Sequence, residues 1–535
     1  MQDHWDWIVV GSGFGGSVSA LRLAEKGYSV LVLEKGRRFS PGDFPKTNWN
    51  LKRWLWLPRM GFRGIFKMTF LKHLTSLNGV GVGGGSLVYA NTLPTPEADF
   101  FEAPDWGHLA PWREELAPHY DTARHMLGAS EYPGETHADR ALKKVAEALG
   151  REAYFSPTQV AVFFGDPDRT VPDPYFAGEG PPRTGCNGCG GCMTGCRFGA
   201  KNSLDLNYLW LAEGRGAKVL ADTEVTWIEP LEAGFRVLTR GGGPGFRRTS
   251  RTVTANNVVL SAGVLGTVEL LLRLRRSPRG LPELSNRVGD RVRTNSEVLV
   301  AVTTERRDLD LSEGIAITSI LRTDDQSFVE PCRFSAGSGF FRLLATPHAP
   351  GGNAPARIAN AFRRAFRHPL KTLRMILVPD WAKHTTILLY MRTHEGFIRL
   401  ELGRKLSTLF GVGLKSMPGE GPLPTAAIPE ATELAEAFAA EVDGTPGSLI
   451  SETLFGIPTT AHILGGACMG SGPEDGVIDH RHRVFGYPGL WVVDGSAVSA
   501  NPGVNPSLTI SALAERAMSF IPPKADLSAP EISNE

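Results

Sequence analysis

The 535-residue sequence predicts an α/β protein that combines a Rossmann-like dinucleotide-binding domain with a second domain built on an antiparallel sheet. Residues 6–36 have the pattern of a complete βαβ unit with a glycine-rich turn, and strand–turn–helix patterns return at 256–273 and 489–518. Between these segments, "TTILLYMRTHEGFIRLEL" (385–402) alternates apolar and polar residues, which is typical of antiparallel strands.

The N-terminal motif is "DWIVVGSGFGGSVSALRLAEKGYSVLVLEKG", in which Gly11, Gly13 and Gly16 follow an apolar strand. The first glycine allows a tight turn, the second lets a pyrophosphate approach the backbone, and the third lets the helix pack on the strand. Glu34 ends the second strand, where an acidic side chain accepts hydrogen bonds from an adenosine ribose. This order of features predicts a dinucleotide site but does not separate NAD from FAD.

Composition narrows the class of protein. Lys and Arg number 57 and Asp and Glu number 56, so the formal charge of +1 gives no reason to expect a nucleic-acid partner. No apolar run is long enough to span a bilayer, and "MQDHWD" leads directly into a strand without a basic leader segment. We therefore expect a cytoplasmic protein that contacts membranes at most peripherally.

Four further segments carry a family resemblance: "GVGVGGGSLVYANTLPTP" (79–96), "NNVVLSAGVLGTVELLLR" (256–273), "AHILGGACMG" (461–470) and "GLWVVDGSAVSANPGVNPSLTISALAERAM" (489–518). Together with the first motif they resemble the glucose-methanol-choline (GMC) oxidoreductases, flavoenzymes that bind FAD. The "GVGGGSLV" and "GVNPSLTISALAER" segments are most similar to the cholesterol oxidase branch of that family.

The resemblance implies a set of FAD-binding residues spread over the chain. The second glycine-rich loop would lie against the flavin and the pyrophosphate, and the acid and glycine after the last strand would close the site. The helix beginning near Pro506 would direct its positive end towards the flavin. The expected cofactor-binding residues are Gly11, Gly13, Gly16, Glu34, Gly83, Gly84, Gly85, Ser86, Val225, Asp494, Gly495 and Pro506.

The same resemblance places catalysis on His462 and Asn505. Alcohol oxidation moves a hydride to flavin N5 and removes the hydroxyl proton, and a histidine titrating near neutrality suits the proton step. Asn505 is no base at neutral pH, so its amide would hold the substrate oxygen. A structural histidine in the core and a helix N-cap are the competing interpretations of the two residues.

A cysteine-rich segment, "GCNGCGGCMTGCRFGAKNS" (185–203), contains Cys186, Cys189, Cys192 and Cys196. The spacing C-x2-C-x2-C-x3-C is that of bacterial ferredoxins, and part of the segment resembles FAD-dependent sugar dehydrogenases that hold an iron–sulfur cluster. We expect a 4Fe–4S or 3Fe–4S cluster on these thiolates. Tetrahedral zinc and unmetallated thiols remain alternatives.

A cluster beside FAD would pass electrons singly to an external carrier protein, which predicts a dehydrogenase. The similarity to cholesterol oxidases predicts transfer to oxygen instead, with or without a linked isomerisation. Flavin-dependent desaturation or ene reduction, and a non-enzymatic flavin and iron–sulfur electron-transfer or redox-sensing protein, are the remaining alternatives.

Two segments interleave apolar residues with Arg and Lys, at 49–74 and 357–381. In the second, apolar residues recur at helical spacing around a break at Pro369. Such segments lie on anionic membranes or form ordinary solvated helices. A membrane contact would favour a sterol or another hydrophobic alcohol as substrate.

The order of motifs predicts two discontinuous domains. The FAD-binding domain is expected at 1–100, 185–300 and 455–535, with the cysteine-rich segment inside it, and the substrate domain at 101–184 and 301–454. Residues 231–263 are expected to form a hairpin around the "GGGPG" turn.

Overall fold

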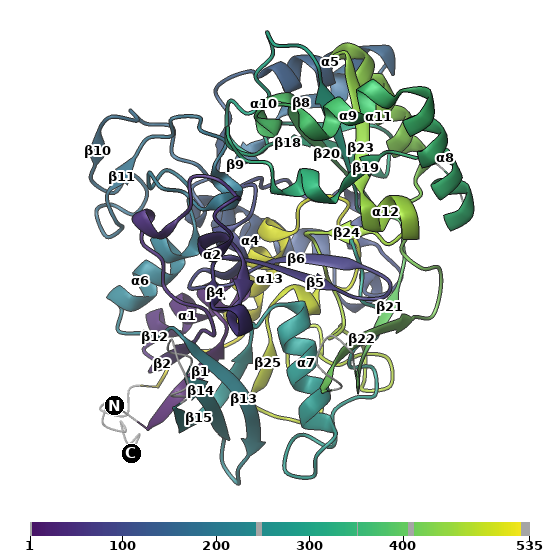
Figure 1. The fold of residues 1–535 in the computed structure, drawn as a ribbon. Helices are drawn as coiled ribbons and strands as arrows, with labels where there is room; N and C mark the ends of the chain where they lie inside the picture. Colours follow the sequence, from purple (N-terminus) through teal and green to yellow (C-terminus); the bar gives the residue numbers. More distant parts are fainter. Residues whose placement is uncertain (1–2, 242–248, 350, 352, 405–410, 526–535) are drawn as a thin grey trace, which may run out of the picture.

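The computed structural model describes residues 3–241, 249–349, 351, 353–404 and 411–525. Two seven-stranded sheets organise this part of the chain, one in the lower and one in the upper half of Figure 1. The predicted α/β fold class is therefore confirmed. Most of the predicted "GGGPG" turn belongs to residues 242–248, which lie outside the described residues.

The lower sheet is the dinucleotide-binding type. Its strands are β1 (His4–Val10), β2 (Val30–Leu33), β12 (Lys218–Leu220), β13 (Thr223–Pro230), β14 (Phe235–Gly241), β15 (Ser250–Leu260) and β25 (Leu490–Val492). The order is β12-β2-β1-β15-β14-β13, with β25 also paired to β15. The pairs among β12, β2, β1, β15 and β25 are parallel, and β13 and β14 add an antiparallel extension. The carboxyl ends of β1, β2, β15 and β25 therefore meet at one edge.

The upper sheet is antiparallel. Its strands are β8 (Phe155–Pro157), β16 (Val298–Thr304), β17 (Ser319–Arg322), β18 (Ser327–Cys332), β19 (Ala345–Pro347), β20 (Thr385–Arg392) and β23 (Gly444–Leu449). Their order is β19-β23-β16-β20-β18-β17-β8. The residues of β21 (Ile398–Arg404) differ from expectation, because this strand forms a separate two-stranded ribbon with β22 (Val412–Pro418) and is not a strand of the upper sheet.

Side chains of β16 alternate between an apolar core on one face of the upper sheet and a cavity on the other. Val298, Val300 and Val302 belong to an apolar core shared with α5 (His137–Ala148) and α11 (Pro429–Glu441). Leu299 and Ala301 point to the opposite face, where they line the large cavity of the molecule. Since side chains alternate in a strand, a helix-covered face and a cavity wall arise from the same apolar sequence.

The remaining helices and strands complete the two halves. The helices are α1 (Phe14–Glu25), α2 (Leu51–Trp54), α3 (Ala98–Phe101), α4 (Trp112–Met126), α6 (Tyr208–Gly214), α7 (Val264–Arg275), α8 (Ala354–Arg367), α9 (Pro369–Leu377), α10 (Trp381–His384), α12 (Ile450–Phe455) and α13 (Ser507–Ser519). The short strands are β3 (Trp56–Leu57), β4 (Phe62–Arg63), β5 (Phe66–Phe70), β6 (Thr75–Gly79), β7 (Ser130–Glu131), β9 (Gln159–Val160), β10 (Thr170–Val171), β11 (Arg183–Thr184) and β24 (Thr459–Thr460).

The predicted helices of the dinucleotide-binding half are confirmed at α1, α7 and α13. Helix α1 packs against α6 and α13, and α13 packs in turn against α4. The predicted break at Pro369 is also confirmed, because α8 ends at Arg367 and α9 begins at Pro369. Among the described residues, no helix combines the length and apolar character needed to cross a bilayer.

Candidate active site

A cavity of about 1020 Å³ lies between the two sheets. One end is lined by the two glycine-rich loops and the carboxyl ends of the parallel strands, and the other by apolar side chains from the upper sheet. His462 and Asn505 both line it. The structure thus brings the predicted cofactor loops and the two predicted catalytic residues around one space.

The first glycine loop is built so that backbone groups meet closely. Gly11 has φ +96°, and a Cβ there would lie 2.3 Å from the Ser261 carbonyl oxygen. A Cβ at Gly16 would lie 2.1 Å from the Gly11 carbonyl oxygen, so Gly16 serves packing and does not line the cavity. At Gly13, which caps α1, a Cβ would meet no protein atom within 4 Å. That open approach at a helix N-terminus fits a pyrophosphate.

The second glycine loop lies directly on the first. Gly84 and Gly85 line the cavity, and a Cβ at Gly84 would be 2.6 Å from the Cα atom of Gly13. Gly83 (φ +102°) and the buried Ser86 stand behind them, where the Ser86 hydroxyl donates to the Gly83 carbonyl oxygen at 2.7 Å. Gly83 and Ser86 therefore shape the loop and do not face the cavity.

Acidic residues close two sides of the cofactor end. Glu34 follows β2 and accepts hydrogen bonds from the Ser12 hydroxyl at 2.8 Å and from the Gly36 amide at 2.8 Å. Asp494 follows β25 and accepts from the Thr267 hydroxyl at 2.6 Å, tying β25 to α7. Both carboxylates line the cavity. They stand at the carboxyl ends of parallel strands, where doubly wound folds bind dinucleotides.

The other predicted cofactor residues complete the same wall. Val225 of β13 lines the cavity beside the first loop, and Gly495 and Pro506 line it from the C-terminal segment. Helix α13 begins at Ser507, with Pro506 as its cap residue. The interpretation of Asn505 as the helix N-cap is therefore wrong, because Asn505 precedes the cap and its side chain faces other partners.

His462 is paired with a carboxylate that sequence reasoning did not find. The imidazole Nδ1 lies 3.3 Å from Oε2 of the fully buried Glu297, and Glu297 also accepts from the Thr460 hydroxyl at 2.7 Å. Burial by itself would lower the pKa of His462, but the Glu297 carboxylate outweighs burial and raises the pKa above its usual value. With Nδ1 directed at Glu297, Nε2 is the nitrogen left for a substrate.

Asn505 belongs to a second buried polar group. The Thr92 hydroxyl donates to the Asn505 amide oxygen at 3.3 Å and lies 3.4 Å from Glu330 Oε1. The pKa of Glu330 is raised to about 7, because burial outweighs the opposing effects of neighbouring Asn505 and His462. Asn505 and Thr92 line the cavity, whereas Glu330 stands behind them. Glu330 therefore holds Asn505 in place from the second layer of the wall.

The far end of the cavity is apolar and large. Strands β16 and β20 of the upper sheet contribute alternate residues to it, β18 contributes Cys332, and aromatic side chains also line it. The apolar lining residues are Met68, Leu77, Met193, Leu299, Ala301, Ile317, Cys332, Phe334, Phe341, Trp381, Ile387 and Leu389. A bulky apolar molecule with one polar group fits this arrangement, with the polar group towards His462 and Asn505.

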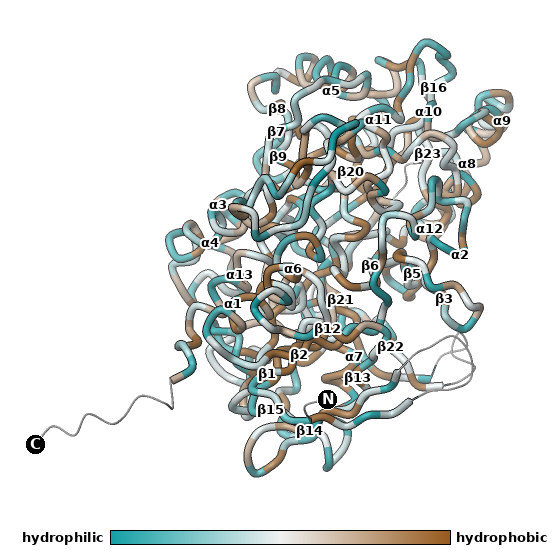
Figure 2. The backbone as a smooth tube through the Cα atoms, turned by 90° about the vertical axis from the view of Figure 1, so that its left-hand side faces the viewer, coloured by the Kyte–Doolittle hydropathy of each residue, from teal (hydrophilic) through white to brown (hydrophobic). Residues whose placement is uncertain are grey.

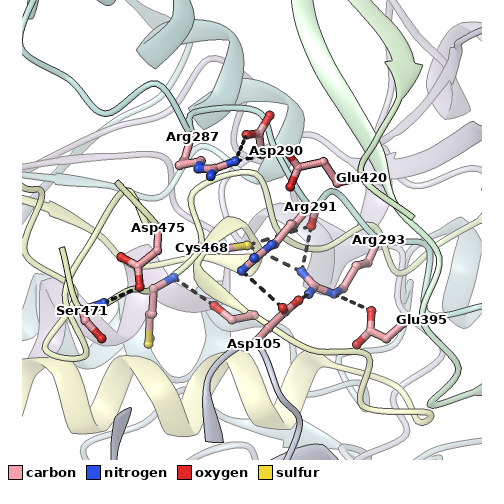
Figure 3. Close-up of polar contacts among 12 residues, drawn as sticks. Asp105, Arg287, Asp290, Arg291, Arg293, Glu395, Glu420, Cys468, Ser471 and Asp475 are labelled. Carbon is pink, nitrogen blue, oxygen red and sulfur yellow. Dashed lines mark hydrogen bonds and ion pairs between the residues drawn. The ribbon is translucent and has the colours of Figure 1, made fainter. Parts of the chain in front are cut away.

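A buried arginine, Arg293, holds the segment that carries His462. Arg293 exchanges backbone hydrogen bonds with Leu464, two residues beyond His462. Its guanidinium contacts Asp105 and lies 3.1 Å from Glu395, while Cys468 Sγ is 3.6 Å away (Figure 3). This network holds the His462 segment against distant parts of the fold. The buried Cys468 packs against the Arg293 guanidinium.

The structure does not support the predicted metal centre in the cysteine-rich segment. The four thiols line a small separate cavity of about 20 Å³, but in the described part of the chain no three His, Cys, Asp or Glu side chains are grouped to hold a metal ion. Burial raises the pKa of the Cys186 thiol to about 12. The iron–sulfur prediction at Cys186, Cys189, Cys192 and Cys196 is therefore not supported.

The same segment has a structural connection to the cofactor loop. Cys186, Cys192 and Cys196 pack against an apolar cluster. The buried Lys201 ammonium donates to the carbonyl oxygens of Leu87 at 3.1 Å, Tyr89 at 2.9 Å and Cys192 at 2.8 Å. One side chain thus ties the cysteine-rich segment to the chain that follows the second glycine loop.

Comparisons with known proteins fit this geometry. Residues 9–43 match the model of an NAD(P)-binding Rossmann-like domain, and residues 182–320 and 425–514 match two GMC oxidoreductase models. A cholesterol oxidase of Acinetobacter baumannii is 44% identical over 98% of this chain and 95% of its own. The chain belongs to the GMC oxidoreductase family. A cholesterol oxidase of Mycobacterium tuberculosis is 47% identical over 98% of this chain and 92% of its own.

The solved structure of pyridoxine 4-oxidase from Mesorbium loti superimposes with a TM-score of 0.62, 17% identity and coverage of 96% of this chain and 99% of the other. At that identity the match supports the fold alone. As a GMC oxidoreductase the protein uses FAD, and the open approach at Gly13 and the carboxylate of Glu34 fit that cofactor. Sequence reasoning missed Glu297 and Glu330, because neither stands in a recognisable motif.

Proposed function

We propose that the protein oxidises the hydroxyl group of a hydrophobic, sterol-like alcohol to a ketone and delivers the electrons to oxygen. The observation that carries the proposal is the apolar end of the cavity, which opens onto His462 and Asn505. The names of the two relatives at 44% and 47% identity, both cholesterol oxidases, support the same substrate class.

Different residues of the chain orient the substrate and take its hydroxyl proton. FAD, when bound, accepts the hydride from the alcohol carbon. The Asn505 amide orients the substrate oxygen, held in turn by Thr92. His462 Nε2 takes the hydroxyl proton, and the carboxylate of Glu297 stabilises the imidazolium that forms. The apolar wall excludes water from the reacting groups.

Oxygen is the acceptor that we favour over a carrier protein. Support for this choice comes from the two relatives at 44% and 47% identity, since both are named as oxidases. Two electrons and two protons leave the alcohol, and one oxygen molecule takes them up to give hydrogen peroxide. An external electron carrier is the alternative acceptor.

The test is to mix the purified protein with cholesterol, first without air and then with oxygen. Anaerobic bleaching of the flavin by cholesterol, rapid recovery in oxygen, and one peroxide formed per ketone are the expected results. Bleaching without recovery in oxygen would contradict the choice of acceptor, and absence of bleaching would contradict the substrate class. Iron and sulfide found in the protein would restore the relay.

The pH dependence of the reaction reports on the pair of His462 and Glu297. His462 must be neutral to accept a proton, so kcat/KM should fall as pH decreases through its raised pKa. Glu297→Gln removes the carboxylate that raises this pKa, so the acidic limb of the profile should move to lower pH. Stopped-flow reduction of the flavin across pH measures it.

Two further variants should shift the acidic limb less than Glu297→Gln does. Glu330→Gln should shift the limb in the same direction by less, because Glu330 raises the pKa of His462 less than Glu297 does. Glu452→Gln, a buried carboxyl that does not act on His462, should leave the limb in place. A limb that stays fixed in Glu297→Gln would remove His462 from the proton step.

A further inference from the structure

Helices α8 and α9 turn an apolar row towards solvent. The row consists of Phe362, Phe366, Leu370, Leu373 and Leu377, here called the outer face, and Phe366 is 82% exposed. Both helices stand at the edge of the molecule beside α12 (Figure 2). An amphipathic helix of a globular protein normally buries its apolar side, so this orientation requires an explanation.

The orientation is fixed by contacts on the opposite side of the helices. The buried Arg357 guanidinium donates from Nε to the Thr453 carbonyl oxygen at 3.1 Å and from Nη1 to the Gly351 carbonyl oxygen at 3.0 Å. Ala361 and Met375 are buried on the same side. A polar anchor is therefore buried while the aromatic and leucine side chains are left outside.

The charged side chains of α8 and α9 themselves are all basic. No acidic residue occurs between Ala354 and Leu377. Two of the cations are neutralised by the rest of the protein, in the pairs Arg364–Glu436 and Arg374–Glu305. Exposed Arg363, Arg367 and Lys371 form no ion pair with any described residue. Apolar side chains flanked by unpaired cations are the pattern of a helix that lies on an anionic bilayer.

The outer face adjoins the wall of the active-site cavity. Leu343, at 65% exposed, stands two residues before Ala345, which lines the cavity. Leu449 lines the cavity and is followed by the exposed Ile450 at the start of α12, and α12 packs against α8. The 66% exposed Phe70 also lines the cavity and marks a place where it reaches the surface.

We propose that the outer face docks onto the surface of a bilayer rich in anionic lipid. The proposal rests on the sterol-like substrate proposed above, which resides in membranes and would enter the cavity without crossing water. A second copy of the chain fits less well, because a symmetric pair would bring Arg363, Arg367 and Lys371 against the same three cations. Insertion of the apolar row and attraction of these cations would act together.

Sedimentation of the FAD-loaded protein with vesicles tests the proposal. We expect binding to vesicles of phosphatidylcholine with phosphatidylserine, and weak binding to phosphatidylcholine alone or at high salt. The triple variant Arg363→Gln, Arg367→Gln, Lys371→Gln should partition about a hundredfold less, from roughly a fivefold loss per cation. Phe366→Ser with Leu370→Ser should also release the protein from anionic vesicles.

Matched control variants make the same change in net charge or in apolar surface, but outside the outer face. Arg113→Gln, Arg169→Gln, Arg279→Gln removes three exposed cations outside the outer face, and Leu149→Ser with Leu423→Ser removes two exposed leucines. These controls should bind like the unchanged protein. Equal binding by all variants, or none by the unchanged protein, would overturn the docking proposal, as would a dimer in solution that Phe366→Ser dissociates.

The same variants separate docking from chemistry. With cholesterol dispersed in detergent and no bilayer present, the outer-face variants should keep the kcat/KM of the unchanged protein. If the unchanged protein does not oxidise dispersed cholesterol, the proposed function fails, while the vesicle result still stands by itself. If oxidation proceeds and vesicles are not bound, only the docking proposal fails.

Discussion

Replacing His462 by alanine is expected to lower kcat for cholesterol oxidation by about two to four orders of magnitude, the range that one positioned acid–base group contributes. The imidazole lines the cavity, as Asn505 does, and its Nδ1 atom lies 3.3 Å from Glu297. Anaerobic flavin reduction measures the effect directly, because it isolates the step in which the alcohol is oxidised.

The variant leaves Glu297 buried without its imidazole partner, so folding must be checked separately. FAD content and the thermal unfolding midpoint serve that purpose, and His462→Gln, which retains a polar side chain, provides a second route to the same loss of rate. His108→Ala changes an exposed histidine outside the cavity and should leave the rate unchanged. Flavin reduction within threefold of normal in both His462 variants would show that another group takes the proton.

The sequence predicted the cofactor half of the molecule because its signals are local. Gly11, Gly13 and Gly16 indicate a turn within six residues, and Glu34 ends the strand that follows the next helix. The βαβ unit is therefore recognised without any distant contact. The same holds for the segment around Asp494 and for the start of α13. Each of these elements is specified by residues adjacent in the chain.

The carboxylates that complete the site could not be predicted in this way. Glu297 reaches His462 across 165 positions of sequence, and Glu330 reaches Thr92 across 238. Such pairings depend on how the upper sheet lies on the lower one. A single acid immediately before the apolar strand 298–304 was the available signal for Glu297, since a charged residue flanking a buried strand usually has a partner.

The two segments singled out for their chemistry show what spacing and periodicity leave undetermined. Ferredoxin-like spacing predicts a metal site, yet the described residues show no grouping of three ligands there, since spacing fixes sequence separation and not the direction of the Sγ atoms. The helical row in 357–381 has two interpretations from sequence, a helix on an anionic membrane and an ordinary solvated helix. In the structure the apolar side is the exposed one. Periodicity could not reveal this, because it shows that a helix has an apolar face but not whether that face packs against the protein.

Adding one methyl group to the first glycine loop is expected to have opposite consequences at Gly13 and Gly15. A Cβ at Gly15 would lie 1.7 Å from the Val493 carbonyl oxygen, so Gly15→Ala must push α1 away from β25 and should destabilise the protein even without FAD. A Cβ at Gly13 meets no protein atom within 4 Å, so Gly13→Ala should fold normally.

The methyl group of Gly13→Ala would instead occupy the approach to the N-terminus of α1 that a pyrophosphate needs, and FAD should bind about a hundredfold more weakly, which corresponds to about 2.8 kcal/mol. Gly214→Ala, at an exposed glycine with open space around it, should change neither property. Unfolding of the apoproteins and FAD titration distinguish the two effects. Normal FAD affinity in Gly13→Ala would mean that the cofactor does not pass this loop, because only a ligand lying there would sense a methyl group that the protein itself does not contact.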